Sequence, residues 1–182
     1  MTIPVLIVDD DVRVAVNHQK FVDRVDGFTV VGLAHTAEQA MGLVTELQPE
    51  LVLLDIYLPD DSGVRLLQRL RGGAHAIDVI VITAARDTET VQASMQAGAV
   101  QYLLKPFPFS ALRDRLERYA AAKNKLASVT EAEQSDVDHV FGLLRSEAQS
   151  SLPKGLSQAT AQLVTDTLRT AGSDLSAAEV AE

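Results

Sequence analysis

The stretch IPVLIVDDD, residues 3–11, decides the fold class of this chain, because an apolar run ends directly in three carboxylates. Short runs of this kind are typical of strands in a parallel sheet that helices cover on both faces. Similar runs follow at 28–33, 51–54, 77–82 and 100–104. Helical patterns alternate with them, at roughly 12–24, 37–47, 63–72, 87–97 and 109–125. Five β/α repeats predict an α/β fold with an open, doubly wound parallel sheet of five strands.

Composition narrows the class of protein. Hydrophobic residues make up 47% of the 182 residues, which is enough for a folded core. The absence of cysteine excludes disulfides, thiolate metal sites and thiol catalysis. No apolar run approaches the roughly 18 residues that span a bilayer, and no signal-peptide pattern opens the chain. We therefore expect a cytoplasmic protein without a membrane partner.

Negative charge is concentrated toward the end of the chain. The net charge is −9, and residues 126–182 hold Arg145, Lys154 and Arg169 against nine acids. A DNA-binding arm carries the opposite balance. Any DNA-binding function must therefore explain this acidic tail.

The ends of the predicted helices carry their own signals. Thr36 and Gln39 are spaced as a capping box at the start of the second helical pattern. Gly98 follows the fourth pattern, where a left-handed C-cap is expected, and Gly72-Gly73 ends the third.

Polar side chains gather where the predicted strands end. Ligands of open α/β sheets bind outside the carboxyl ends of the strands, so this edge is the expected site. A solvated turn explains a single acid after a strand, but not carboxylates, a hydroxyl and an ammonium on one edge. The residues concerned are Asp9, Asp10, Asp11, Asp55, Thr83 and Lys105.

These residue types suit phosphoryl transfer to a carboxylate. A carboxylate attacks phosphorus poorly unless a cation relieves the charge repulsion, and hard divalent cations prefer oxygen ligands. Asp10 and Asp55 can ligate such a cation directly, and Asp9 can do so through water. The backbone carbonyl of Tyr57 can add a ligand, and Lys105 can neutralise phosphoryl oxygens.

Four motifs at these strand ends resemble the receiver domain of two-component response regulators. The matching text is Val-Asp9-Asp10-Asp11, Asp55-Ile-Tyr-Leu-Pro59 with Gly63, Thr83-Ala84-Ala85, and Tyr102-Leu-Leu-Lys105-Pro106-Phe107. The resemblance covers about residues 1–120, and the motifs occur in the family's order at the right strand ends. It implies a receiver domain over residues 1–122 with the flavodoxin-like strand order 2-1-3-4-5.

The resemblance also implies how the site works. Asp55 accepts a phosphoryl group from a sensor histidine kinase, Asp9 and Asp10 form the Mg²⁺ pocket, and Lys105 contacts the phosphate. The Lys105–Pro106 peptide bond is expected to be cis. Receivers assist their own phosphorylation but turn over no external substrate, so we do not expect an enzyme.

Thr83 and Tyr102 are the switch pair that the resemblance implies. Phosphorylation adds a charge of about −1.5 to −2. We expect Thr83 to be drawn toward the phosphoryl group and Tyr102 to rotate inward. The face of the fourth helix, fifth strand and fifth helix then rearranges. The helix from about residue 109 adjoins this face, so we expect a homodimer.

The tail is predicted to be helical. Residues 123–151 are interpreted as a linker, with a capping box at Thr130 and Glu133. Residues 152–182 resemble the start of the helix-turn-helix effector in the citrate/C4-dicarboxylate-responsive branch of response regulators. The matching text is Leu152-Pro-Lys-Gly-Leu-Ser157 and Ser176-Ala-Ala-Glu-Val-Ala181.

In that branch a recognition helix follows, and here it is missing. Most base contacts come from that helix, which explains an acidic tail. We therefore expect a fragment of a longer regulator, with DNA binding weak or absent in this chain. A generic helical dimerisation tail is the alternative for this segment, and a phosphorelay or protein-interaction receiver is the alternative function.

Other chemistries fit less well. Asp9-x-Asp11 is similar to the nucleophile motif of haloacid-dehalogenase-type phosphatases, but Arg13 stands where that motif needs Thr or Val. No GxxxxGK[ST] loop and no Ser-His-Asp set is recognisable. The four histidines share no metal-ligand spacing, and we expect surface or boundary positions for them. They are His18, His35, His75 and His139.

Overall fold

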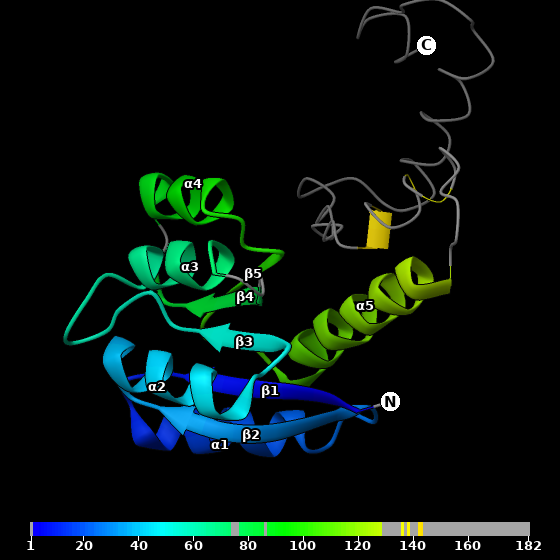
Figure 1. The fold of residues 1–182 in the computed structure, drawn as a ribbon, viewed down its shortest axis with the longest axis horizontal. Coiled ribbons are helices and arrows are strands. Elements are labelled where there is room, and N and C mark those ends of the chain that lie inside the picture. The colour runs from blue at the N-terminus through cyan, green and yellow to red at the C-terminus, as the bar shows by residue number, and fades with distance from the viewer. Residues whose placement is uncertain are drawn as a thin grey trace, which may run out of the picture. The chain divides into compact units, whose positions relative to one another are not determined.

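Five parallel strands form the centre of the computed structural model, and the arrows of β2, β3 and β4 can be seen to point the same way in Figure 1. The strand order is β2-β1-β3-β4-β5, and every neighbouring pair is parallel. This confirms the predicted α/β fold and its doubly wound order. The strands are β1 Ile3–Val8, β2 Phe28–Ala34, β3 Leu51–Leu54, β4 Asp78–Thr83 and β5 Gln101–Leu104.

The structure describes residues 2–73, 77–85 and 87–128, together with residues 136, 138, 142 and 143. The helices of this part are α1 Val12–Val22, α2 Ala37–Leu47, α3 Gly63–Arg71, α4 Thr88–Gln96 and α5 Phe109–Ser128. None of them is long and apolar enough to cross a membrane. Apart from those four positions, the predicted linker beyond Ser128 and the helix-turn-helix start lie outside the described residues.

Two hydrophobic cores lie on the two faces of the sheet. Alternate residues of a strand point to opposite faces, so β1 contributes to both. Val5 and Ile7 pack with α1 and α5, whereas Leu6 and Val8 pack with α2 and α3. The central strand β3 is buried throughout, and each fully buried leucine there contributes roughly 2 kcal/mol. Burial on both faces is why these strands read as continuous apolar runs.

Helix ends follow local capping chemistry, with one difference from prediction. Thr36 accepts a hydrogen bond from the Gln39 N–H at 3.1 Å, but the Gln39 side chain accepts from the His35 N–H at 2.9 Å, so the predicted box is only half formed. Gly98 has a φ of +91°, as a left-handed C-cap requires. Gln48, a non-glycine residue, ends α2 with a φ of +46°.

Candidate functional site

Backbone hydrogen bonds extend the sheet one residue past the strands and fix the functional residues. The Asp55 N–H donates to the Val8 carbonyl at 2.8 Å, and the Lys105 N–H donates to the Thr83 carbonyl at 2.9 Å. Asp9, Asp55 and Thr83 are all buried. The predicted acids Asp9, Asp10 and Asp55 therefore meet Lys105 at the carboxyl edge. Asp11 instead caps α1, where its side chain accepts from the Arg13 and Val14 N–H groups. The Lys105–Pro106 bond is cis, as predicted.

Lys105 bridges two buried carboxylates. Its Nζ lies 2.6 Å from Asp9 Oδ2 and 2.6 Å from Asp55 Oδ2. Burial acts to lower the pKa of Lys105, but the hydrogen bonds that its ammonium donates to Asp55 and Asp9 outweigh it, so the pKa is raised. Burial raises the pKa of Asp9 despite the nearby ammonium. One cation is thus shared between two acids.

A third acid completes an oxygen cluster. Carboxylate oxygens of Asp9, Asp10 and Asp55 lie within 4.8 Å of one another, and Asp10 is exposed. Three hard oxygen donors with an opening to solvent suit Mg²⁺. Tyr57 lies two residues after Asp55, and its N–H donates to Asp55 Oδ1 at 3.0 Å. The residues present therefore fit the predicted metal pocket.

The loop after Asp55 folds tightly against the start of α3. The Gly63 N–H donates to the Ile56 carbonyl at 3.0 Å. A Cβ on Gly63 would lie 2.5 Å from Ile56 Cα and 2.7 Å from its carbonyl oxygen, so no larger residue fits without moving backbone. A bridge between Tyr57 and Ser62 closes the loop. This close packing restricts the backbone conformation of the loop that follows Asp55.

Thr83 and Tyr102 are linked through a single residue, Ala85. The Ala85 N–H donates to the buried Thr83 Oγ1 at 3.3 Å, and the Tyr102 hydroxyl donates to the Ala85 carbonyl at 3.1 Å. Burial raises the pKa of Tyr102, and the nearby Asp87 adds to this effect, so its hydroxyl is protonated and able to donate. A displacement of Ala85 would therefore be felt by both side chains.

Two histidines reach the site, which the sequence did not predict. His18 is 5% exposed, so the expected surface or boundary position is wrong for it. Its Nδ1 lies 3.6 Å from Asp9 Oδ2, and its ring stacks on Phe107 at 5.3 Å. Burial, reinforced by Lys105, lowers the pKa of His18 to about 4.

The signal for His18 was its position on the buried stripe of α1, between Ala15 and Val22. His35 Nδ1 lies 2.8 Å from the Asp9 carbonyl oxygen, a contact across 26 residues that no local pattern reveals. His75 and His139 lie outside the described residues.

Comparison with protein families gives a match over more than half of the chain. The family described as "Response regulator receiver domain" matches residues 5–117. The chain is 39% identical over 178 residues to the "Probable C4-dicarboxylate response regulator DctR" of Bacillus subtilis, covering 98% of this chain and 78% of that protein. It is 35% identical over 182 residues to the "Transcriptional regulatory protein CitT" of the same organism, covering 99% and 80%.

A solved structure shares the fold. The CheY-like response regulator receiver domain protein from Methanospirillum hungatei JF-1 superposes with a TM-score of 0.64 at 26% identity. The match covers 69% of this chain and 99% of that one. The similarity thus spans the whole of that receiver domain.

Proposed function

This chain belongs to the response regulator receiver family, in the branch of DctR and CitT, and we propose on that premise that Asp55 is its phosphoacceptor. The observation that carries the proposal is the position of Lys105, whose ammonium lies 2.6 Å from both Asp55 and Asp9. Asp10 opens the same cluster to solvent. A buried carboxylate beside a shared cation, open on one side, is placed to receive an anionic group.

The transfer places one new bond on Asp55. A carboxylate oxygen of Asp55 bonds to phosphorus while the bond from phosphorus to the donor nitrogen of a phosphohistidine breaks. The electron pair leaves with the imidazole, which takes a proton from solvent. Asp9, Asp10, Asp55 and the Tyr57 carbonyl would hold Mg²⁺, which supplies charge neutralisation when bound. Lys105 exchanges a carboxylate partner for a phosphoryl oxygen.

Thr83 and Tyr102 form the switch in this proposal. A new phosphoryl oxygen at Asp55 attracts the Thr83 hydroxyl, which then gives up the Ala85 N–H. Ala85 also holds the Tyr102 hydroxyl, so its displacement frees Tyr102 to turn inward. The population shift is limited by the differential affinity of the two states for the phosphoryl group.

We propose transcriptional control as the output. The receiver match ends at residue 117, yet the similarity to DctR and CitT extends over nearly the whole chain. Residues after the receiver are therefore shared with proteins named as response or transcriptional regulators, which favours this output over a phosphorelay module. A sensor histidine kinase, DNA and a second copy of the chain are the proposed partners, in the cytoplasm. The controlled genes would serve di- or tricarboxylate transport or metabolism.

Labelling tests the phosphoacceptor. The chain is incubated with acetyl phosphate and Mg²⁺, and the acyl phosphate is measured by a phosphate-affinity gel shift that hydroxylamine reverses. Asp55→Asn should abolish the shift. Asp61→Asn, which removes an equal charge from the same loop, should be labelled like the natural chain. If Asp55→Asn is still labelled, Asp55 is not the phosphoacceptor.

A further inference from the structure

The junction between β2 and α2 touches both acidic loops of the site. At its first residue, His35 Nδ1 lies 2.8 Å from the Asp9 carbonyl oxygen. A carbonyl oxygen can only accept, so Nδ1 carries the proton and donates. The Asp9 N–H donates to the Ala34 carbonyl at 3.0 Å. Both the N–H and the carbonyl of Asp9 are therefore hydrogen-bonded to the adjacent residues Ala34 and His35.

The other side of the junction is bound by Asp60, an exposed residue five positions after Asp55. Asp60 Oδ1 accepts the Ala37 N–H at 2.8 Å, and Oδ2 accepts the Glu38 N–H at 3.0 Å. These N–H groups belong to the first turn of α2, where helix donors lack partners of their own. The same two hydrogen bonds lower the pKa of Asp60, so the carboxylate is ionised and accepts through both oxygens.

From Asp60 the backbone returns to Asp55 within a closed loop. The Tyr57 N–H orients Asp55 Oδ1, the Tyr57–Ser62 bridge closes the loop, and Gly63 leaves it no room to relax. A shift at Asp60 is therefore passed to the Asp55 carboxylate. Hydrogen bonds thus join the Asp9 loop and the Asp55 loop through four residues, His35–Glu38, which we name the α2 strap.

We propose that His35 and Asp60 are positioning residues for the metal pocket, because the α2 strap fixes the separation of the Asp9 and Asp55 loops. The inference rests on the proposed function of that pocket. Lys105 pairs with two of the three clustered carboxylates, Asp9 and Asp55, and the mutual repulsion of the three tends to push the loops apart. A strap that resists this keeps the oxygen ligands at the spacing a small cation requires.

Mg²⁺ affinity of the unphosphorylated chain is the direct test, measured by isothermal titration calorimetry. Asp60→Asn keeps the shape but turns one oxygen into an NH₂ group that cannot accept an N–H. His35→Leu removes the donor. Each should weaken Mg²⁺ binding about tenfold, the lower end of the range for residues that hold ligands in place. Asp61→Asn should stay within about twofold, and His35→Gln, which keeps a donor, should recover much of the loss.

A positioning role has two further signatures. At saturating Mg²⁺ the labelling rate of both variants should return to within about threefold of the natural chain, because the bound ion restores the spacing. The double variant should bind Mg²⁺ no more weakly than the weaker single variant, because either break releases the whole strap.

The outcomes separate this inference from the proposed function. If the unaltered chain binds Mg²⁺ and both Asp60→Asn and His35→Leu bind it with the same affinity, the positioning role of the α2 strap is wrong, but the metal pocket stands. An equal loss in Asp61→Asn would also overturn it, since charge and not position would then be the cause. Absence of Mg²⁺ binding by the unaltered chain would remove the pocket and the strap together.

Discussion

Two lysines at opposite ends of the sheet show how differently this molecule uses a charge. Lys105 at the carboxyl edge contacts Asp9 and Asp55, and all three side chains are at most 19% exposed. Lys123 on α5 forms an ion pair with one acid, Glu50, among the residues that the structure describes, and both side chains are about 40% exposed. One lysine serves two buried acids in the first case, and one half-exposed acid in the second.

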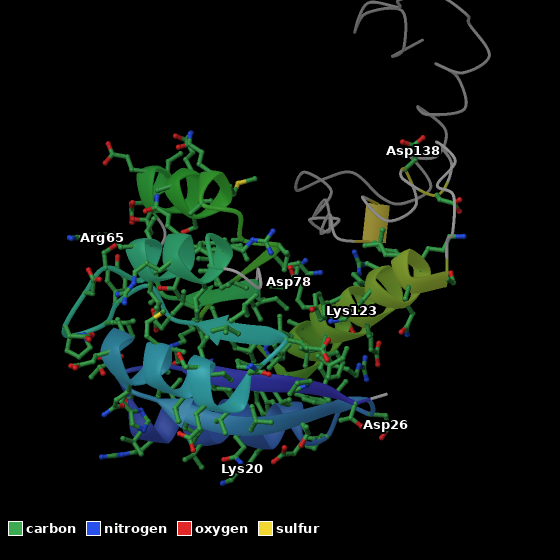
Figure 2. All side chains as sticks on the ribbon, viewed as in Figure 1. Lys20, Asp26, Arg65, Asp78, Lys123 and Asp138 are labelled. Carbon is green, nitrogen blue, oxygen red and sulfur yellow. The ribbon has the colours of Figure 1, made fainter. Side chains whose placement is uncertain are left out.

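At the amino edge, Asp78 and Glu50 each pair with a basic side chain. Figure 2 labels Asp78 and Lys123 at the end of the sheet where the strands begin, opposite Arg65 on α3. Asp78 accepts hydrogen bonds from Arg71 at 2.7 Å and from the Tyr119 hydroxyl at 2.9 Å. Its charge is therefore met within the protein. The carboxyl edge has three clustered carboxylates and one lysine paired with two of them, and such charge imbalance is common at functional sites.

The largest effect should come from removing Lys105, with Lys123 as the matched comparison. Lys105→Met leaves two buried acids without a cation and should cost about 3 kcal/mol of unfolding free energy in the absence of metal. Lys123→Met removes a surface pair and should cost less than about 1 kcal/mol. Urea unfolding at pH 7 measures both. Equal losses of unfolding free energy in the two variants would contradict the difference between the edges. Saturating Mg²⁺ should restore the stability of the Lys105 variant only.

Acid should weaken the carboxyl edge through His18. Its pKa is about 4 in the folded chain against an ordinary 6.5, so only the unfolded state gains a proton as the pH falls below 6.5. The stability present above pH 6.5 is then lost on the way to pH 4, about 2 kcal/mol of it by pH 5.

Asp9 acts in the opposite direction. Its pKa is raised, so the folded state gains a proton first and recovers part of the loss as the pH falls. Urea unfolding of the metal-free chain at pH 7 and pH 5 should show the net decrease. His18→Asn should reduce it, and identical pH dependence in the two chains would contradict the role of His18.

Tyr119 tests the amino edge alone. Tyr119→Phe keeps the buried ring but removes the hydroxyl that donates to Asp78, at a cost of about 1.5 kcal/mol. The rate of labelling by acetyl phosphate should not change, because Tyr119 and Asp78 lie at the edge of the sheet opposite Asp55. A slower rate without loss of folded protein would mean that the two edges are coupled.

The smallest effect should have the opposite sign. Asp10→Asn relieves repulsion among the carboxylates and should stabilise the metal-free chain by about 0.5 kcal/mol. The same variant should lose most of the stabilisation that Mg²⁺ gives the natural chain. Thermal unfolding with and without Mg²⁺ measures both. If Asp10→Asn instead destabilises the metal-free chain, repulsion among the three carboxylates does not lower its stability.

Sequence reasoning predicted much of the fold and the core of the site for one reason. The spacing of hydrophobic residues can be read from a short stretch of sequence, and so can the polar residues that follow each apolar run. The runs at β1, β3 and β4 therefore gave both the strands and the place where Asp9, Asp55 and Thr83 would stand. The resemblance to receiver domains also predicted the cis peptide bond between Lys105 and Pro106, which the structure contains.

Contacts that depend on packing could not be predicted in this way. Asp60 reads as a loop acid, yet it caps a helix that begins 23 residues earlier. His18 reads as one polar residue in an amphipathic pattern, yet it lies buried against Phe107. Such partners are decided by how far a side chain reaches once the layers have packed.

Lys105 shows where the division falls. The sequence by itself determined the α/β fold, the strand order through its motifs, and the edge at which a lysine would meet the acids. Only the tertiary structure decided that Lys105 is shared by two buried carboxylates while Lys123 pairs with the half-exposed Glu50. Periodicity along the chain sets which residues are buried, but charge balance is a property of side chains that meet across distant segments.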